Sequence, residues 1–547
     1  MVSFLRLLST LVFTAEGALM EQHEGITNVC YMLTPAVMLV VLAFPLSTRA
    51  QMTSVGVDCS QIPARQIWRQ DNLRASIILQ ECGLAPGTAK ADSSGSASDQ
   101  EPAPPNILVS NRQCTSSGTC TKSESSVWHS SKVGDHTVVV NFNDIDNQLT
   151  GTAYSTDDGA TFTQIVPPPF TTGHSFNYGD PIVAYNQKLN LWFAGDLVTG
   201  CGGFGIGLWT SPDGQHWTTG ACAHSGDNDD RPSMWVDNNP FSRRYGRMYV
   251  SWNDYDFSGA IVVSHSDDGN TWSTPVQVSS TFERDVQLTG TLPGPPPPNA
   301  GFTSTVFVVG MDEGSGGFDT RQNLIYRSTD GGVTWTAITM GPRFNPPGDQ
   351  LCASRSYFPI INPIWRLTGY GQPAVGPNGV VHYVYAGKGS LSGGDIFYTR
   401  STNNGSTWST PIILNDPETN QYQSHWMPSV SVNYNLAGFR QPEDVTVYWY
   451  DRRNATTVCN VITDPGCEYQ VYGVQSTDNG TTWGANFAIS SGLINQPSAP
   501  PIDACYAGDY NYSTALGGTA FVTWTDGRVA VGGVQVQNVD FAGTPEP

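Results

Sequence analysis

Basic residues are scarce in this 547-residue chain, which has 26 Lys and Arg against 47 Asp and Glu and a formal net charge of −21. A protein that binds nucleic acid or an anionic membrane needs a cationic face, so we expect neither partner. Long amphipathic helical patterns are nearly absent, whereas Gly, Pro and aromatic residues are plentiful. Because short strands separated by Gly-rich and Pro-rich turns are typical of β proteins, the sequence predicts an all-β fold.

Long apolar runs occur only near the N-terminus. The stretch YMLTPAVMLVVLAFPLSTRAQ, from Tyr31, has an apolar core followed by small residues at the positions that a signal peptidase reads. We therefore expect a leader over residues 1–50, cleaved after Ala50, with a membrane anchor as the alternative. A cleaved leader predicts a secreted, periplasmic or cell-surface protein without membrane contact.

The cysteines are even in number beyond this leader. Of the 11 cysteines, Cys30 lies in the leader, which leaves ten, and an even count in an exported protein indicates disulfides. No spacing resembles a zinc ribbon. Proximity in sequence, with the last pair assigned by elimination, predicts Cys59–Cys82, Cys114–Cys120, Cys201–Cys222, Cys459–Cys467 and Cys352–Cys505.

The chain divides by composition into a short N-terminal part and one large domain. Residues 59–82 contain the one convincing helix, with Pro63 near its start, so we expect residues 51–86 to form a small disulfide-clamped helical cap. Residues 87–105 are small, polar and Pro-rich, which is typical of a linker. Residues 106–547 form the remaining domain.

A short turn motif recurs along this domain, and each copy follows a run of strand-forming residues. Gly supplies the positive φ of a tight turn, and Ser and Asp side chains bond to the turn backbone, so we interpret the motif as a hairpin turn rather than a reactive site. The third copy has His265 where the others have Ser, and the fifth has Asn403 where the others have Asp. The six copies are STDDGATF (155–162), SPDGQHW (211–217), HSDDGNTW (265–272), STDGGVTW (328–335), STNNGSTW (401–408) and STDNGTTW (476–483).

A second element, a strand that ends in a polar loop, recurs seven times between the turns. Examples are VVVNFNDID (138–146), MYVSWNDYD (248–256) and VTVYWYDRR (445–453). Together with a shorter strand before it, each unit reads as four antiparallel strands, with the turn between the third and fourth. This arrangement predicts a β-propeller of seven blades, with six as the alternative. The seventh unit lacks an outer strand, which NILVSN (106–111) could supply.

The six turns resemble the Asp-box, or bacterial neuraminidase repeat, of the sialidase superfamily, over roughly residues 106–540. The resemblance implies a propeller and a secreted, exo-acting glycoside hydrolase, with exo-α-sialidase as the specific candidate. The chain departs from the family in two ways. Sialidases have six blades, and the Phe-Arg-Ile-Pro signature expected before the first box is missing, since FRQP (439–442) lies between the fifth and sixth boxes.

Strand alternation places the candidate site on the loops opposite the turns. A sialidase-like site needs arginines that clamp a carboxylate, a tyrosine nucleophile activated by a glutamate, and an aspartate that handles the leaving-group proton. YNYSTALGG (510–518) resembles the segment that carries the nucleophile in bacterial sialidases. The resemblance therefore implies Tyr512, Asp144 and Glu468 as catalytic residues. The substrate-binding candidates are Arg231, Arg452, Arg453, Arg528, Asp180, Asp254, Asp451, Asp526 and Tyr510.

Three functional alternatives stay open, because a fold does not decide activity. The first is the hydrolase, the second a non-catalytic propeller that binds carbohydrate or protein at the cell surface, and the third a lyase or another glycosidase with an aspartate pair. Each loop aspartate also has a structural interpretation, as a loop cap or an inter-blade hydrogen-bond partner. We expect a monomer with no metal or cofactor. The alternative is Ca²⁺, for which GDNDDR (226–231) and NDID offer oxygen ligands without EF-hand spacing.

Overall fold

The computed structural model describes residues 58–84, 106–110, 121–145, 149–165, 173–293, 301–366, 369–434, 442–460, 466–500, 502–531 and 534–545. The predicted leader, the linker and the Cys114–Cys120 pair lie outside the described residues. Everything described from Cys59 onward belongs to one compact unit. This unit is built almost entirely of antiparallel strands, which confirms the all-β prediction.

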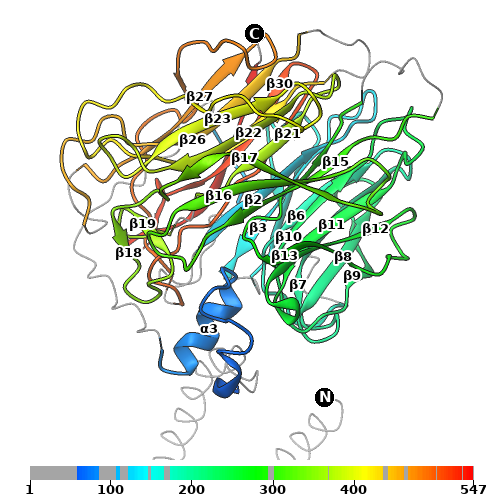
Figure 1. Cartoon of the computed structure of the whole chain (residues 1–547), viewed down its shortest axis with the longest axis horizontal. Coiled ribbons are helices and arrows are strands. Elements are labelled where there is room, and N and C mark those ends of the chain that lie inside the picture. Colours follow the sequence, from blue (N-terminus) through cyan, green and yellow to red (C-terminus); the bar gives the residue numbers. More distant parts are fainter. Residues whose placement is uncertain are drawn as a thin grey trace, which may run out of the picture. The chain divides into compact units, whose positions relative to one another are not determined.

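Seven four-stranded sheets follow one another within the described residues (Figure 1). The first three are β2 (Lys122–His129), β3 (Val138–Asp144), β4 (Gly151–Ser155), β5 (Thr163–Gln164); β6 (Ile182–Asn186), β7 (Leu191–Val198), β8 (Gly205–Ser211), β9 (Thr218–His224); and β10 (Asp229–Val236), β11 (Met248–Asp254), β12 (Ala260–Ser266), β13 (Val276–Phe282). The next three are β14 (Leu288–Gly290), β15 (Val306–Asp312), β16 (Arg321–Ser328), β17 (Thr336–Phe344); β21 (Gln372–Val375), β22 (Val381–Gly387), β23 (Asp395–Ser401), β24 (Ile412–Ile413); and β25 (His425–Val432), β26 (Val445–Asp451), β27 (Gln470–Ser476), β28 (Phe487–Ala488).

The seventh sheet joins the two ends of the large domain. It consists of β29 (Ser513–Leu516), β30 (Thr519–Asp526), β33 (Asn538–Pro545) and β1 (Ile107–Leu108). Ile107 pairs with Phe541, and Leu108 pairs with Asp540, in antiparallel register. The prediction that the segment 106–111 supplies the outer strand of this unit is confirmed.

The first strands of the seven sheets lie side by side around one cavity. Each contacts the first strand of the next sheet, in the order β2, β6, β10, β14, β21, β25 and β29, and β29 contacts β2. All seven line a cavity of about 100 Å³. The cavity therefore brings together side chains from sheets that are distant in sequence.

The hydrophobic core is divided between neighbouring sheets rather than gathered at one centre. Val139 of the first sheet packs in one cluster with Trp192 of the second, and Tyr249 of the third packs with Val306 of the fourth. These side chains are all essentially inaccessible to solvent. Burial of such large apolar groups is the main favourable contribution to folding.

The recurring Ser-Asp-Gly segments are turns between the third and fourth strands, as predicted. In STDGGVTW the hydroxyl of Ser328 accepts from the backbone N–H of Gly332 at 2.8 Å and donates to Asp330 at 2.8 Å. Asp330 in turn accepts from the backbone N–H of Thr334 at 3.0 Å. The polar side chains are therefore occupied in holding the turn.

Two copies of the turn show that its hydrogen bonds do not require one fixed residue at each position of the motif. In the fifth, Asn403 accepts from the N–H of Thr407 at 2.9 Å, so an uncharged amide does the work of the aspartate. In the third, Ser266 rather than His265 takes the serine position, because Gly269 N–H donates to Ser266 Oγ at 2.8 Å. The expected alignment of that copy was wrong by one residue.

The N-terminal cap contains less helix than expected. A 3₁₀ turn, η2 (Cys59–Gln61), is followed by turns, and α3 (Leu73–Glu81) begins only at Leu73. Asn72 caps α3 by accepting a hydrogen bond from Ala75 N–H at 2.8 Å, so the polar residue and not Pro63 sets the helix start. The disulfide Cys59–Cys82 clamps the two ends, as predicted.

An insertion between the fourth and fifth sheets forms a small sheet of its own, with strands β18 (Gln350–Leu351), β19 (Pro359–Ile361) and β20 (Trp365–Arg366). A two-stranded sheet of β31 (Ala530–Val531) and β32 (Val534–Gln535) follows β30.

The predicted pairs Cys352–Cys505, Cys201–Cys222 and Cys459–Cys467 are also present, and the first ties the insertion to residue 505. Four disulfides are typical of proteins from oxidising compartments. No helix in the described part is long and apolar enough to cross a membrane.

Candidate functional site

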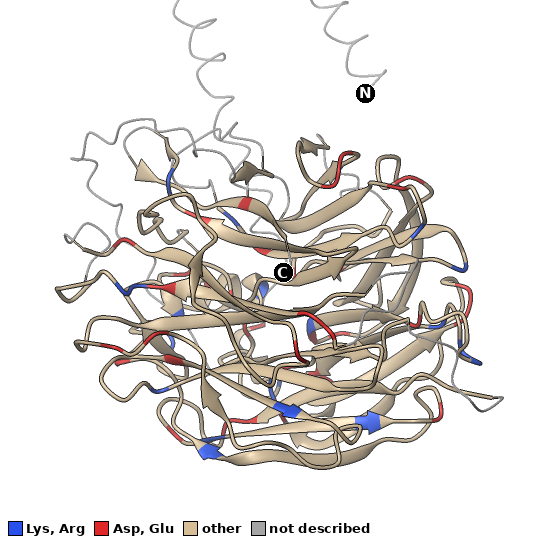
Figure 2. Ribbon diagram, turned by 90° about the horizontal axis from the view of Figure 1, so that it is seen from above, with Lys and Arg blue, Asp and Glu red and all other residues tan. Residues whose placement is uncertain are grey.

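Four arginines are buried together where the first strands begin, in a chain with only 26 Lys and Arg. Figure 2 marks Lys and Arg in blue and Asp and Glu in red. Arg231 lies in β10, Arg284 precedes β14, Arg355 lies between β18 and β19, and Arg366 ends β20. None is more than 5% exposed. We call these four residues the arginine cluster.

One carboxylate lies among three members of this cluster. Oδ2 of Asp71 lies 3.1 Å from Nη1 of Arg284 and 3.5 Å from Nη1 of Arg231, and Arg366 donates to the carbonyl of Asp71. Tyr370 donates its hydroxyl to the same Oδ2 at 2.5 Å. Burial alone raises the pKa of Asp71, but Arg284, Arg231 and the Tyr370 hydrogen bond outweigh it and lower that pKa below its usual range.

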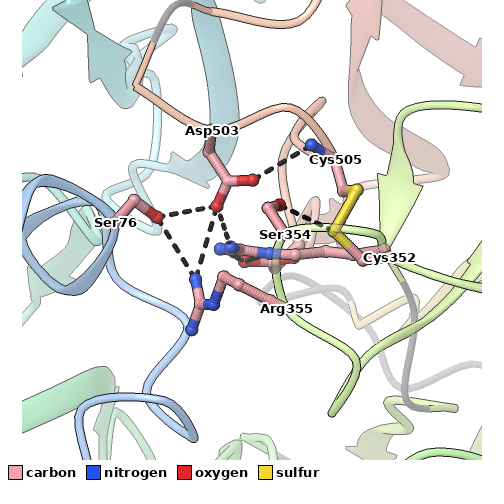
Figure 3. Close-up of a disulfide and its surroundings, with 8 residues drawn as sticks. Ser76, Cys352, Ser354, Arg355, Asp503 and Cys505 are labelled. Carbon is pink, nitrogen blue, oxygen red and sulfur yellow. Dashed lines mark hydrogen bonds and ion pairs between the residues drawn. A yellow bond between two sulfur atoms is a disulfide. The ribbon is translucent and has the colours of Figure 1, made fainter. Parts of the chain in front are cut away.

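The other side of the cluster is neutralised by two buried aspartates. Arg366 lies 2.6 Å from Asp503 and 2.6 Å from Asp509, and Arg355 lies 3.3 Å from Asp503. Figure 3 shows Asp503 reaching Arg355 and also Ser76 of α3, next to the Cys352–Cys505 disulfide. A buried guanidinium persists only when it is paired and hydrogen-bonded, so this network is what allows so many charges to remain inside.

Several sheets share one backbone feature near the start of their first strands. Non-glycine residues with positive φ stand at or just before five of the seven first strands: Glu124, Asp180, Arg231, Asp285 and Met427. In β2, β10 and β25 the residue lies within a register shift against the second strand. Bulges of this kind re-aim side chains, and strained backbone of this kind is concentrated at functional sites.

Aromatic rings cover Arg231. Its guanidinium lies 3.9 Å from the ring centre of Tyr370 and 5.0 Å from that of Tyr510. Tyr510 and Tyr512 are stacked, with centroids 4.7 Å apart. Burial raises the pKa of Tyr512, and the positive charge of Arg231 is the main effect that opposes this shift. Arg231 is therefore held between a carboxylate and a set of phenol rings.

Burial raises the pKa values of several acids beside the cluster. Burial raises the pKa of Asp285 to about 6, although Arg231 opposes the shift. Burial and the charge of Asp71 raise the pKa of Asp230 to about 8. Burial also raises the pKa values of Asp180 and Glu124. A carboxylic acid with a pKa close to neutrality is the group that general acid catalysis requires.

The structure brings together four of the residues expected from the sequence: Arg231, Asp180, Tyr510 and Tyr512. Oδ2 of Asp180 accepts from the backbone N–H of Arg231 at 3.1 Å, and the two tyrosines lie beside the Arg231 guanidinium. Neither their catalytic nor their binding roles follow from this placement alone.

Arg452, Arg453 and Arg528, which the sequence placed with Arg231 in a carboxylate clamp, have other partners in the structure. Arg528 lies 2.7 Å from Asp526 and 2.9 Å from Asp540. Arg453 lies 2.6 Å from both Asp451 and Asp416. Arg452 donates to Asn362 and to the carbonyls of Thr457 and Gly466. Among the described residues, none of these ion pairs and hydrogen bonds joins the three arginines to the arginine cluster.

The remaining expected acids also have local partners. Asp451 and Asp526 pair with the arginines two residues ahead of them, Arg453 and Arg528, as already described. Asp144 lies 3.7 Å from Lys122 across β2 and β3. Asp254 accepts from the N–H of Asp256 in the loop after β11. Glu468 acts electrostatically on Arg452. The catalytic roles of Asp144, Glu468 and Tyr512 stay a prediction.

Sequence reasoning missed Arg284, Arg355, Arg366, Tyr370 and Asp71. The signal for Arg284 was available, because ERDVQL occupies the same place before its strand as DRPSMW does around Arg231. Arg355, Arg366 and Tyr370 belong to or follow an insertion that has no counterpart in the other units, so no repeat alignment could find them. Asp71 lies in the cap, for which the repeats offer no guide.

Among the described residues, three groups of side chains outside the arginine cluster bring possible metal ligands together: His174, Cys201 and Cys222; His224, Asp229 and Asp254; and Asp395, Glu418 and His425. The two cysteines of the first group are joined in a disulfide. Asp229 belongs to the GDNDDR loop, where Ca²⁺ was the sequence alternative. In the second group His224 Nδ1 lies 2.6 Å from Asp229 Oδ2, and burial raises the pKa of Asp229 to about 7. The same hydrogen bond pairs the His224 imidazole with the Asp229 carboxyl group without a metal ion.

No protein-family model and no curated protein matches the chain. Solved structures that resemble it include the BP39L lectin from Burkholderia pseudomallei (11% identity, 78% of this chain and 98% of that one, TM-score 0.47). They also include an α-L-arabinofuranosidase from Fusarium graminearum (12% identity, 63% and 92%, TM-score 0.39) and the Hadza microbial sialidase Hz136 (14% identity, 78% and 66%, TM-score 0.35). At these TM-scores and identities the similarity carries no argument about what this chain binds.

Proposed function

We propose that the chain is a seven-bladed β-propeller that binds an acidic, carboxylate-bearing glycan at the arginine cluster. Seven sheets, the contact between β29 and β2, and one cavity lined by all seven first strands support the blade count. The six turns support the sialidase-like family resemblance, since each uses its Ser and Asp or Asn to hold a hairpin. The concentration of unusual residues where the first strands begin supports a site at that end.

The observation that carries the proposal is that Arg231, Arg284 and Arg366 converge on Asp71 from three separate parts of the chain. Guanidinium groups match carboxylates by charge and by planar geometry. Maintaining four guanidinium groups inside a protein is costly, and a hydrophobic replacement would serve stability equally well. A ligand carboxylate is a functional reason for keeping them.

Hydrolysis is the second candidate, and one feature favours it. Tyr512 lies beside Arg231, and Asp285, with a pKa of about 6, also faces Arg231, so a tyrosine and a carboxyl group that takes up a proton below about pH 6 flank the bound carboxylate. In this site Asp285 rather than Asp144 is the candidate proton donor. The rival is a non-catalytic glycan-binding propeller, in which the same residues only hold the sugar acid.

Thermal shift and calorimetric titration with N-acetylneuraminate, glucuronate and neutral galactose test the binding proposal. We expect the two acids to bind, more tightly to an Asp71→Ala variant than to the wild type, and galactose to bind neither protein. Arg366→Ala should abolish binding, whereas Arg528→Ala, which removes an equally ion-paired arginine far from the cluster, should not. Galactose binding as strong as that of the acids would contradict the proposal. A fluorogenic sialoside, with Tyr512→Phe as the variant, separates hydrolysis from binding alone.

A further inference from the structure

We infer that the segment of residues 69–76 of the N-terminal cap is an intramolecular competitor that occupies the ligand site. Asp71 then holds the place of the ligand carboxylate. This inference rests on the proposed function, because it identifies the arginine cluster as the site that an acidic ligand would enter. It adds a built-in means of keeping that site closed. We call residues 69–76 the cap segment.

The cap segment contacts the site as a bound peptide does. Three consecutive carbonyl groups, of Arg69, Gln70 and Asp71, accept hydrogen bonds from Arg284, Arg355 and Arg366 respectively. The Asp71 carboxylate additionally meets two guanidinium groups and a phenol, as described above. Main-chain and side-chain acceptors of one short segment thus engage all four members of the arginine cluster.

Further contacts fix the segment on both sides of Asp71. The side-chain amide of Gln70 donates to Asn228 at 2.8 Å, and that of Asn72 donates to Asp230 at 2.8 Å. Ser76 donates to Asp503 at 2.7 Å (Figure 3). Leu73 is fully buried in an apolar cluster that includes residues of the first three sheets. A ligand cannot reach the guanidinium groups while these contacts persist.

Asp71 does not satisfy every polar atom of the site that it occupies. Its Oδ1 is buried and has no hydrogen-bond partner in the described structure, and the same is true of Nε of Arg231 and of Arg355. A second carboxylate oxygen and two guanidinium N–H groups therefore remain unused inside the site. Unsatisfied buried groups are costly, so a ligand that engages them gains affinity that the cap segment does not have.

The cap segment is covalently attached to the domain whose site it occupies, as an intramolecular competitor must be. The cap segment lies within a 24-residue module, 59–82, that is closed on itself by the Cys59–Cys82 disulfide. It is followed in sequence by GTAKADSSGSASDQEPAPP, a composition typical of linkers. A tethered ligand acts at high effective concentration, so even a moderate fit closes the site against dilute external ligands.

The test uses the full chain with acetate as a carboxylate-sized probe and N-acetylneuraminate as a sugar acid, each titrated at constant ionic strength. Asp71→Ala removes the competing carboxylate, and Asp71→Asn retains its shape in case the alanine variant folds poorly. Glu81→Gln, which removes one exposed negative charge from α3, is the matched control. We expect both Asp71 variants to bind acetate at least about tenfold more tightly than the wild type, with the control unchanged.

The outcomes separate this inference from the proposed function. If the Asp71 variants gain acetate binding but no sugar acid binds, the competitor is supported and the glycan proposal fails. If the wild type binds N-acetylneuraminate as tightly as the variants do, the glycan proposal is supported and the competitor is refuted. Folded Asp71 variants that gain neither probe also overturn the inference.

Discussion

Oδ2 of Asp71 lies 3.1 Å from Nη1 of Arg284, and the two side chains are 2% and 0% exposed, although 213 positions separate them in sequence. The cap is thereby joined electrostatically to the entrance of the fourth sheet. Arg284 also pairs with Glu313, whose Oε2 is 2.9 Å from its Nε. Removing either charge leaves an uncompensated partner in a region that water does not reach.

Replacing Arg284 by Ala should therefore destabilise the fold strongly. Loss of one partner of a buried ion pair costs about 3–5 kcal/mol, because the remaining charge is left without compensation. Arg343→Ala is the control, since the Arg343–Asp312 pair is about half-exposed and should contribute less than about 1 kcal/mol. Urea unfolding of both variants measures the difference, and equal effects would show that the Arg284 network is not a buried one.

The turn motif should be insensitive to charge and sensitive to its serine. Asp330→Asn should change the free energy of unfolding by less than about 0.5 kcal/mol, because Asn403 already fills that position in another copy. Ser328→Ala removes the acceptor of the Gly332 N–H and should cost about 1 kcal/mol or more. Neither change should alter ligand affinity, and an altered affinity would contradict the structural role of the turns.

Asp196 should make stability depend on pH. Burial raises the pKa of Asp196 to about 8, and Asn177 and Thr150 only partly oppose this. Between about pH 4 and pH 8 the folded chain therefore retains a proton that the unfolded chain releases, so the free energy of unfolding falls as the pH rises through this window.

Asp196→Asn, which cannot ionise, should remove that slope. Relative to the wild type, the variant should gain stability between pH 5 and pH 8, on the order of a few kcal/mol. Urea titrations at the two pH values measure this. Asp349→Asn, at an exposed position, is the control and should leave the slope unchanged. If the difference in unfolding free energy between the variant and the wild type is the same at pH 5 and pH 8, Asp196 is ionised in the folded protein at both pH values, and the prediction fails.

Opening the cap disulfide should favour ligand binding. A cross-link between residues 23 apart stabilises the folded state by about 3 kcal/mol, because it restricts the unfolded loop. Without the Cys59–Cys82 disulfide the undocked cap gains conformational entropy, so the docked state of the cap becomes less stable. A Cys59→Ser/Cys82→Ser variant should therefore bind N-acetylneuraminate several-fold more tightly than the wild type. Cys459→Ser/Cys467→Ser, which opens a loop remote from the cap, is the matched control. Tighter binding in both variants would indicate general loosening rather than release of the cap.

Repetition made the fold predictable. The turn copies and the seven second strands place every sheet correctly, and the pairing of residues 107–108 with the last sheet could be anticipated because one unit lacked a strand. The third turn was misaligned by one residue, since a serine one place later fills the same hydrogen-bonding position. The helix start was misplaced because a polar cap at Asn72 determined it rather than Pro63.

The candidate site was only partly predictable, because it is made from exceptions to the repeat. Arg231, Asp180, Tyr510 and Tyr512 could be found, since they stand where first strands begin. Arg452, Arg453 and Arg528 were favoured by the sequence because they follow second strands. In the structure Arg453 and Arg528 each pair with two aspartates, and Arg452 donates to Asn362 and to carbonyl groups. Arg355, Arg366 and Asp71 come from an insertion and from the cap, whose docking depends on tertiary contacts that no local pattern encodes.

The central claim, that the arginine cluster is a carboxylate site, is tested most directly by titrating the Asp71→Asn variant with N-acetylneuraminate and with its methyl ester. The two ligands share shape and hydroxyl groups and differ in the charge of one group. We predict that the acid binds at least about tenfold more tightly than the ester, since charge-assisted hydrogen bonds to guanidinium groups are lost in the ester. Equal affinities, or binding of neither ligand by the folded variant, would contradict the claim.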